Sequence, residues 1–545
     1  MPSLPSLLSS RIEAVVGVDP ELRPATKPQF GHFQSNVALR LAKSEGRPPR
    51  EVAASILQRL DLDDLCETPE IAGPGFLNLR LKSSVLADWV TGQLADPAAG
   101  IVPGEYRQVV VIDYSAPNVA KQMHVGHLRT TIIGDCLNRV LTAVGHQVIP
   151  QNHIGDWGTQ FGMLVEEILD EGINPDDLDL PALADLYQQA STHFKADTEF
   201  ATAARQRVVA LQAGDLETRN IWRQLIESSL VGFNAAYSRL GVLLTDDDLA
   251  GESMYNDDLP VVAEELESTG AAVIDDGALC AFVEGFNAPM IVRKRDGGFG
   301  YSATDLAAVR HRVRDLHADR LIYVTDARQA DHFGQVFAVC RKAGYLPEGV
   351  RAEHVGYGMV LGPDGKPFKT REGTAVPLTA LLDAAEAQAS PPVALAAIKY
   401  ADLSTGLNKD YVFDVDRMVQ TTGNTGPYLQ YAHARMAQVL RRAEADGLTG
   451  QVTVTVLGEP AEQQLALLLS RFGEVVAEVA ESLQPHKLCT YLYDLAGALS
   501  TFYEQCPVLK SDGEVRDSRL ALCAATKKVL GSGLTLLGIP APDRM

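Results

Sequence analysis

The chain has 545 residues, 46% of them hydrophobic, and a formal net charge of −22. This length exceeds what one hydrophobic core supports, so three or more domains are expected. The N-terminal residues lack a basic region followed by a long apolar run, and no apolar run approaches the ~20 residues of a membrane span. We therefore expect neither a signal peptide nor a membrane anchor and predict a cytoplasmic protein. The seven cysteines are dispersed without a CxxC pair, which argues against disulfides and a structural zinc site.

The acidic charge is concentrated in one part of the chain. Residues 166–276 carry 24 acidic and 6 basic side chains, a bias that is typical of a solvated surface. RNA-binding proteins usually have a basic footprint, so the net charge by itself argues against RNA. The regions on either side of the acidic segment are nearly neutral, however, and can still present basic faces to a phosphate backbone.

The first 100 residues predict an α+β domain. Residues 30–43 predict a polar turn that leads into a helix. Within 71–81, a Gly-Pro-Gly turn precedes alternating polar and apolar residues, which predicts a strand with one exposed face. The Pro- and Gly-rich residues 96–106 predict a linker to the next domain.

Residues 109–135 combine a hydrophobic strand, a Pro-Asn turn and a helix whose first turn contains His124, Gly126 and His127. The two imidazoles are three residues apart and share one helical face. Free backbone N–H groups and the positive end of the helix dipole favour a phosphate there. Gly126 keeps that face open to a flat adenine ring. Taken alone, the pattern also fits a buried strand and helix with two incidental histidines.

A second strand and helix entry follow over 146–162, and this alternation predicts a doubly wound, Rossmann-type parallel sheet. Ligands bind such sheets at the carboxyl ends of the strands. Acidic, helical sequence at about 166–270 predicts an insertion within this α/β domain, which we place at 101–390. Strand-like sequence returns between 271 and 326.

Two later segments carry polar residues suited to a site. Gly362–Gly373 places Lys366 and Lys369 on a Gly-rich loop, where basic side chains could neutralise a triphosphate, although such loops are commonly surface hairpins. Tyr301 and Asp305 share one helical face. A carboxylate and an aromatic wall suit a guanidinium, but a helix start with a surface aspartate explains the pattern equally well.

From residue 391 the sequence is periodic and amphipathic almost to its end, which predicts an all-helical bundle over 391–545. The motifs of several other chemistries are absent from the sequence, which contains no GxxxxGK[ST] loop, HExxH helix or GxSxG turn. The chemistry therefore has to be sought in the histidine pair and the lysine loop.

Together these segments resemble the class I aminoacyl-tRNA synthetases in their arginyl form. Asp113 to His127, with Asn118 and Lys121, is similar to the first signature of that class, and Lys366–Thr370 is similar to its Lys-x-x-Lys-Ser/Thr signature. Three more segments resemble the family's flanking domains, namely the tRNA-binding N-terminal domain at 30–36 and 73–81 and the anticodon-binding bundle at 423–435. The resemblance covers essentially the whole chain.

The resemblance implies an arginine–tRNA ligase, in which the carboxylate of L-arginine attacks the α-phosphate of ATP and arginyl-adenylate then passes its arginyl group to the 3′ end of the tRNA. Catalysis would rest on positioning and charge stabilisation. The residues implied as catalytic are His124, His127, Lys121, Lys366 and Lys369. Some arginyl enzymes lack the second loop lysine and use one before the histidines, so the division between Lys121 and Lys369 stays open.

The resemblance also implies the binding residues. ATP would contact Gly126, His124, His127, Gly356, Met359, Val360 and Lys369. Arginine would contact Asn118, His153, Asp156, Tyr301, Asp305 and Gln329. Phe76 and Asn78 would contact tRNA bases, although a phenylalanine in such a strand is more often core. Mg²⁺ would arrive with ATP, no structural metal is expected, and the protein is expected to be a monomer.

Two alternatives stay open at this point. Another class I synthetase, such as a cysteinyl enzyme, would share the sheet and the bundle, but its Cys/His zinc set is not apparent and Asp305 would not suit a thiol substrate. A non-catalytic tRNA-binding paralogue would share the domains, but it would not need His124, His127, Lys366 and Lys369.

Overall fold

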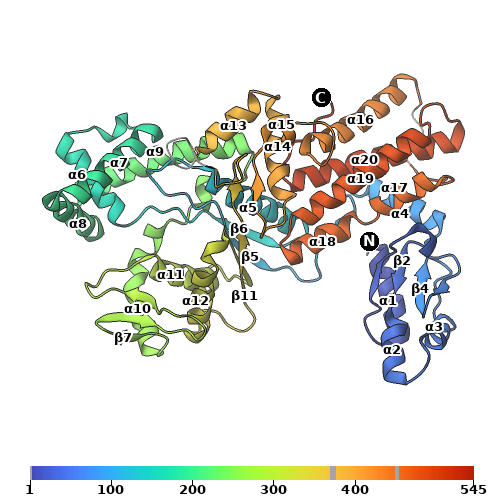
Figure 1. The fold of residues 1–545 in the computed structure, drawn as a ribbon, viewed down its shortest axis with the longest axis horizontal. Helices are drawn as coiled ribbons and strands as arrows, with labels where there is room; N and C mark the ends of the chain where they lie inside the picture. The colour runs from blue at the N-terminus through green and yellow to red at the C-terminus, as the bar shows by residue number, and fades with distance from the viewer. Residues whose placement is uncertain (1–2, 369–375, 449–452) are drawn as a thin grey trace.

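The computed structural model describes residues 3–368, 376–448 and 453–545. A small N-terminal domain lies below one end of a helical bundle, a parallel sheet lies at the centre, and a helical insertion forms the opposite end (Figure 1). An α/β sheet, an α+β N-terminal domain and a helical C-terminal region were the predicted fold class, and this prediction is confirmed. Within the described residues, no helix has the length and apolar character that crossing a membrane requires.

The N-terminal domain combines three helices with a four-stranded antiparallel sheet of order β1-β2-β4-β3. Its elements are α1 (Leu4–Val16), β1 (Leu22–Pro24), β2 (Phe33–Ser35), α2 (Val37–Glu45), α3 (Pro49–Leu57), β3 (Glu70–Ala72) and β4 (Phe76–Leu79). The Ser3 side chain begins α1 by accepting a hydrogen bond from the Ser6 backbone at 3.1 Å, and Leu8 and Ile12 enter the core at helical spacing.

The strand expected within 71–81 is a hairpin, and its second strand is not open on one face. The Gly-Pro-Gly turn separates β3 from β4, as predicted. Leu77, Asn78 and Leu79 are all buried, because β4 lies between β2 and β3 while α2 and α3 pack on it. The prediction of one exposed face is therefore wrong.

The central sheet has four parallel strands in the order β11-β10-β5-β6. They are β5 (Val109–Asp113), β6 (Gln147–Gln151), β10 (Arg320–Asp326) and β11 (Arg351–Tyr357). Helix α5 (Val125–Ala143) joins β5 to β6 on one side, whereas β10 pairs with β5 on the other. The direction of winding thus changes between β5 and β10, and that point of a doubly wound sheet is where ligands bind.

The acidic insertion is helical, as predicted, and some of its carboxylates begin its own helices. It comprises α6 (Thr159–Glu171), α7 (Leu180–Ala196), α8 (Thr198–Ala213) and α9 (Leu216–Leu240), followed by η4 (Glu252–Asp258) and α10 (Leu259–Ser268). Asp179, Asp197 and Asp215 accept backbone N–H bonds at the first turns of α7, α8 and α9. An aspartate there satisfies free N–H groups and complements the helix dipole.

The strand-like sequence after the insertion belongs to two different sheets. Strands β7 (Val273–Asp275), β8 (Ala278–Ala281) and β9 (Met290–Arg293) form a separate antiparallel sheet, whereas β10 enters the parallel one. Helices α11 (Tyr301–Arg314) and α12 (Ala330–Lys342) flank β10 in sequence, and the short helix η5 (Ala327–Gln329) links β10 to α12.

The C-terminal region is helical and packs directly on α5. Its helices are α13 (Leu378–Glu386), α14 (Pro391–Leu403), α15 (Val415–Met418), α16 (Gly426–Ala445), α17 (Pro460–Leu469), α18 (Phe472–Ser482), α19 (His486–Gln505) and α20 (Gly513–Leu536). A two-residue strand, β13 (Tyr411–Val412), pairs in parallel with β12 (Val360–Leu361). Helix α4 (Ser83–Ala95) packs on α17 and α20, and one hydrophobic core runs from the N-terminal domain through α5 to this bundle.

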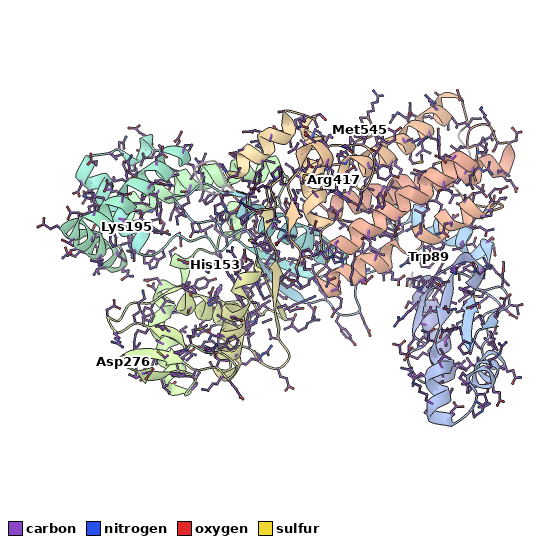
Figure 2. The ribbon with its side chains drawn as sticks, viewed as in Figure 1. Trp89, His153, Lys195, Asp276, Arg417 and Met545 are labelled. Carbon is purple, nitrogen blue, oxygen red and sulfur yellow. The ribbon has the colours of Figure 1, made fainter. Side chains whose placement is uncertain are left out.

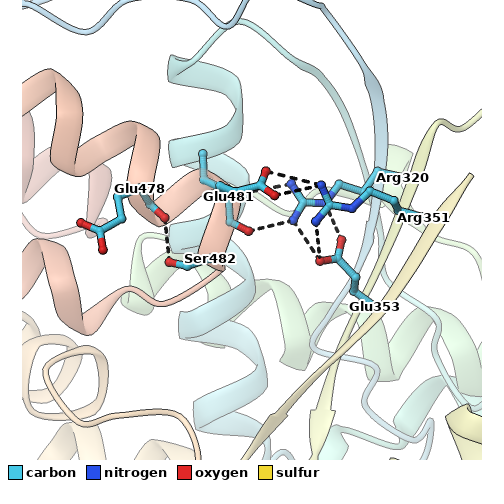
Figure 3. Close-up of polar contacts among 7 residues, drawn as sticks. Arg320, Arg351, Glu353, Glu478, Glu481 and Ser482 are labelled. Carbon is cyan, nitrogen blue, oxygen red and sulfur yellow. Dashed lines mark hydrogen bonds and ion pairs between the residues drawn. The ribbon is translucent and has the colours of Figure 1, made fainter. Parts of the chain in front are cut away.

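The amino ends of the parallel strands are joined to the bundle by a cluster of charged residues (Figure 3). The guanidinium of Arg320 bonds Glu353 at 2.5 Å and donates to the backbone carbonyls of Ala480 and Glu481 in the last turn of α18. A cation at a helix C-terminus is favoured by the helix dipole. Arg351, at the start of β11, bonds the Glu481 carboxylate at 3.1 Å.

Candidate active site

The two predicted histidines form the first turn of α5. The Nδ1 of His124 accepts from the Gly126 N–H at 3.0 Å, and the Nδ1 of His127 accepts from the His124 N–H at 3.1 Å. Because each Nδ1 is an acceptor, each neutral ring carries its proton on Nε2 and can donate it. The His124 ring also folds back over Gly126, where a Cβ would lie 2.7 Å from its Cε1. A larger residue at position 126 would therefore collide with the imidazole ring of His124.

Both histidines are held in the neutral form. Burial, with a smaller contribution from the charge of Lys121, lowers the pKa of His124. Burial lowers the pKa of His127 to about 3. At neutral pH the pair therefore presents hydrogen-bond donors without a formal charge, and the positive end of α5 lies beside them. Such a turn suits the oxygens of a phosphate.

The loop between β5 and α5 contains three non-glycine residues with left-handed backbone, Ser115, Ala116 and Ala120, at φ of 75°, 46° and 63°. Each N–H donates to a side chain from another element: Thr130 of α5, Asn152 after β6 and Ser229 of α9 respectively, at 3.0 to 3.1 Å. Backbone in this region costs free energy and persists only where surrounding contacts determine it. The loop is thus held in one shape by the sheet, α5 and the insertion.

The lysine loop leaves and re-enters the fold beside the histidine turn. It departs after Phe368, whose N–H donates to Val360 O at 3.2 Å. It returns at Val376, whose carbonyl accepts from the Val125 N–H at 2.9 Å, and the Leu378 N–H then donates to Met123 O. Lys366 is exposed on the turn before the loop, whereas Lys369 lies outside the described residues. The chain that follows the segment with Lys369 therefore meets the histidine turn at Val125 and Met123.

The strand end predicted to lie beside adenine is fixed by the segment that follows α14. The Met359 N–H donates to the Asp410 carboxylate at 2.6 Å, and the Met359 carbonyl accepts from the Tyr411 N–H at 3.2 Å. With both backbone groups engaged, Met359 can offer its partly exposed side chain, while Val360 is buried. Gly356 lies so close to η5 that a Cβ would be 3.1 Å from Ala327 Cα.

The opposite side of the site contains the residues predicted to bind an amino acid. Asn118 lies over Gly155, where a Cβ would be 2.5 Å from its Oδ1. Next to it, Asp156 accepts from the Ser253 N–H at 2.8 Å and its hydroxyl at 2.6 Å, and His153 bonds the Ala250 carbonyl at 2.8 Å. In Figure 2, His153 lies where the insertion helices approach the α10–α12 region.

These contacts place Glu252, a residue that the sequence analysis missed, among other acids. Burial raises its pKa to about 7, with Asp156 and then Asp305 adding repulsion. Burial also raises the pKa of Asp156. A buried carboxyl that lies beside two further acids forms a pocket that a cationic ligand would stabilise.

Asp305 and Tyr301 lie on α11 as predicted, together with a histidine from α12. The Asp305 carboxylate bonds His332 Nε2 at 2.6 Å, and the Tyr301 ring lies 5.0 Å from the His332 ring. Tyr301 is 66% exposed, whereas the Asp305 side chain is 15% exposed. The sequence analysis did not include His332, and it predicted Gln329, which is exposed at the end of η5.

Comparison with known proteins agrees with this geometry. Residues 91–392 match the family described as tRNA synthetases class I (R), catalytic domain, residues 4–81 match the arginyl tRNA synthetase N terminal domain, and residues 429–545 match the DALR anticodon binding domain. A Cutibacterium acnes protein named arginine–tRNA ligase is 68% identical, with both chains covered completely. One from Thermobifida fusca is 49% identical over 99% of each chain. The chain belongs to the arginyl-tRNA synthetase family.

Solved structures of arginyl-tRNA synthetases share the whole fold. The enzyme from Plasmodium falciparum superimposes with a TM-score of 0.86 at 27% identity, covering 100% of both chains. The Thermus thermophilus enzyme gives a TM-score of 0.82 at 25% identity, covering 99% of this chain and all of its own. The family resemblance predicted from the sequence is thus confirmed along the whole chain.

Within this synthetase fold, the two residues predicted to contact tRNA bases occupy different environments. Phe76 is half-buried at the start of β4. Asn78 is only 6% exposed, and its Oδ1 accepts from Gln34 Nε2 at 2.8 Å. An amide engaged inside a sheet has to break that bond before it can bind a base. Their tRNA contacts stay predictions.

Proposed function

We propose that this chain joins L-arginine to the 3′ end of its tRNA in two steps at the carboxyl ends of β5 and β10. A carboxylate oxygen of arginine attacks the α-phosphorus of ATP, and the bond to the β-phosphate breaks to release pyrophosphate. A ribose hydroxyl of the tRNA then attacks the carbonyl carbon of arginyl-adenylate, its proton is lost, and AMP leaves. Neither step needs a covalent bond to the protein.

The observation that carries this proposal is the meeting of the lysine loop and the histidine turn. Val376 and Phe368, which bracket the loop, are fixed against Val125 and Val360. The Val376–Val125 contact brings the chain that follows the loop to the histidine turn, and we propose that Lys369 acts beside the Nε2 donors of the histidine pair. Neutral donors and lysine ammonium groups together stabilise negative charge as it moves onto pyrophosphate. We assign His124, His127, Lys121, Lys366 and Lys369 to this role, and Gly126, Gly356, Met359 and Val360 to the surroundings of ATP.

We assign arginine to the acidic pocket on the other side of the site. Asp305 and Glu252 supply negative charge for the guanidinium, and Tyr301 supplies an aromatic wall. Asn118, His153 and Gln329 line the approach to it. Asp156 is bonded to Ser253, so its main effect is to hold Glu252 in place. A thiol substrate gains nothing from this charge, which disfavours a cysteinyl enzyme.

Magnesium would accompany ATP as part of the nucleotide. Asp113, the last residue of β5, is paired with Arg312 at 2.7 Å, and the described residues contain no cluster suited to a metal ion. The metal would therefore be held by phosphate oxygens and water, where it withdraws charge from the phosphates. We also propose domains at 1–100, 101–390 and 391–545, tRNA contacts at Phe76 and Asn78, a cytoplasmic location and a monomer.

ATP–pyrophosphate exchange, measured with each amino acid and with and without cognate tRNA, tests the function. We expect exchange with arginine alone, and only when tRNA is present, as is usual in this family. Exchange driven by another amino acid would contradict the assigned substrate. No exchange under any condition would leave the non-catalytic paralogue as the better explanation.

A further inference from the structure

Lys121 lies at the boundary between the histidine turn and the acidic insertion. Its Nζ is 4.5 Å from the centre of the Tyr187 ring, which belongs to α7. The residue before it, Ala120, has left-handed backbone and is fixed by the buried Ser229 hydroxyl of α9. Two helices of the insertion therefore determine where the backbone and the ammonium of Lys121 lie.

The ammonium is held without being neutralised. In the part of the chain that the structure describes, the Lys121 Nζ contacts the Tyr187 ring and forms no ion pair and no hydrogen bond. This is unexpected beside a segment, 166–276, that carries 24 acidic side chains. An aromatic face attracts a cation but leaves its three N–H groups free and its charge intact. A carboxylate in the same place would compete with a phosphate for that charge.

Lys121 lies three residues before His124, and its charge reaches the site. Burial is the main cause that lowers the pKa of His124 and of His127, and the charge of Lys121 adds to both shifts. Lys121 thus lies within electrostatic reach of both phosphate donors while its far side contacts Tyr187. An unheld lysine side chain would have many rotamers, and fixing one of them in advance reduces the entropy lost when a phosphate binds.

We propose that Tyr187 is a positioning residue for catalysis, whose ring holds the Lys121 ammonium in the orientation that stabilises the leaving pyrophosphate. This assigns a role in the reaction to the acidic insertion, because Tyr187 lies on α7. The inference rests on the proposed function of Lys121. Tyr187 itself contacts neither ATP nor arginine.

The test compares variants in tRNA-dependent ATP–pyrophosphate exchange at saturating ATP and arginine. Tyr187→Leu removes the ring, and we expect kcat to fall about tenfold with the arginine KM unchanged. Tyr187→Phe keeps the ring and should stay within about twofold of the natural protein. Phe194→Leu is the matched control, because Phe194 lies on the same helix with its ring 5.1 Å from Arg205, and its loss should leave kcat unaltered. Thermal unfolding of the four proteins measures any change in packing.

A double-mutant cycle with Lys121→Met separates positioning from a structural role. If Tyr187 acts through Lys121, then Tyr187→Leu lowers kcat in the natural protein and causes no further loss in Lys121→Met. An equal loss in both backgrounds would overturn the proposal, as would an equal loss in the Phe and Leu variants. A higher kcat in Tyr187→Leu would also overturn it, since the ring would then restrain the lysine.

The remaining outcomes distinguish this inference from the proposed function. If Lys121→Met is as active as the natural protein, both the role of Lys121 and that of Tyr187 fail, while arginine-dependent exchange still supports the ligase. If Lys121→Met has no measurable activity, the comparison of Phe with Leu at position 187 decides the inference. If the natural protein shows no arginine-dependent exchange, the proposed function itself is contradicted.

Discussion

The two ends of the central parallel sheet differ in how their charged groups are paired. At the amino end, all three guanidinium nitrogens of the buried Arg320 bond acceptors from Glu353 and α18 (Figure 3). At the carboxyl end, burial raises the pKa of Glu252, and the nearby Asp156 and then Asp305 raise it further. One end satisfies its charges within the protein, and the other leaves charge for a ligand.

Backbone strain is present at the carboxyl end, where three residues of the β5–α5 loop have left-handed backbone. Arg129 Nη2 is also buried there without a hydrogen-bond partner among the described residues, although Arg129 Nε pairs with Asp402 Oδ2 at 3.3 Å. Strain of this kind is common at sites that bind ligands. It is not confined to this end, since His317 and Leu483 have left-handed backbone near the amino ends of the strands. Substitutions at the carboxyl end should change kinetics, and those at the amino end should change stability.

The largest effect is expected for His124→Asn. Asparagine is a good N-cap, so it can replace the Nδ1 acceptor for the Gly126 N–H and keep α5 intact. It lacks the donor that Nε2 offers to a phosphate. We expect kcat to fall about 100- to 1,000-fold while the free energy of unfolding changes by less than ~1 kcal/mol. Exchange kinetics measures kcat, and chemical denaturation measures the free energy of unfolding. A large loss of stability would show that His124 chiefly stabilises the fold, as we expect of residues at the amino end of the sheet.

Asp305→Ala should chiefly weaken arginine binding. Removing the carboxylate leaves a buried guanidinium without its partner, so the arginine KM should rise about 100-fold and the ATP KM should change little. Asp315→Ala provides the control, because Asp315 follows α11 and pairs with His311 outside the pocket. Steady-state kinetics with each substrate varied in turn measures both constants. Equal changes in the two KM values would mean that Asp305 lies outside the arginine pocket.

At the amino end, Arg320→Ala should change stability instead. It leaves Glu353 and the last carbonyls of α18 without a partner, and we expect a loss of about 2–3 kcal/mol, less than for a fully buried pair because Glu353 is partly exposed. The kcat of the remaining folded protein should stay within about twofold of the natural value. Urea unfolding and exchange at 20 °C below the unfolding midpoint check this. A selective loss of kcat would show that the contacts of Arg320 with Glu353 and α18 affect the active site.

Local chemistry made some of this architecture predictable from the sequence. The strand of 109–113, the turn of α5 and the long helices beyond 391 depend on hydrophobic periodicity and capping within a few residues, and they were placed correctly. The alternation within 71–81 was predicted to leave one face open, and that was wrong because α2 and α3 cover β4. Coverage of a strand is set by tertiary packing, which its own sequence does not encode.

The missed residues of the site depend on contacts that are distant in sequence. Glu252 lies in an acidic segment, and contacts with residues that are distant in sequence bring it into the pocket: its own N–H donates to the Ile154 carbonyl at 3.1 Å, and Ser253 bonds Asp156, 97 residues away. Asp410 fixes Met359 across 51 residues. No periodicity or spacing marks such a residue, whereas the histidine pair carries its own local pattern. Local patterns therefore mark candidates on the phosphate side, whereas Glu252 on the proposed amino-acid side carries no such pattern.

The acidic pocket also predicts a pH dependence of arginine binding. The pKa of Glu252 rises on folding from its usual 4.5 to about 7, so the free protein is stabilised less as pH rises through this interval. Arginine binds the ionised form, so its affinity should fall as pH decreases below about 7, by up to about tenfold per unit. Calorimetry in buffers of different ionisation enthalpy would detect the proton released. Glu252→Gln should abolish this release, and its persistence would assign the proton to another group.

The smallest effect on stability is expected for Arg351→Ala. This variant tests whether the ion pairs at the amino end of the parallel sheet stabilise the fold because they are buried or through their charge alone. Arg351 starts β11 directly opposite Arg320 and also bonds Glu353 and Glu481, but Arg351 and Glu481 are 44% and 72% exposed in their side chains. Water and salt screen such a pair, so the loss should stay below ~1 kcal/mol and disappear in 1 M salt. Arg320→Ala should keep most of its effect in salt. If both variants were equally destabilised, the contacts between the amino ends of the strands and α18 would depend on summed surface charge. The contrast between the two ends of the sheet would then no longer hold.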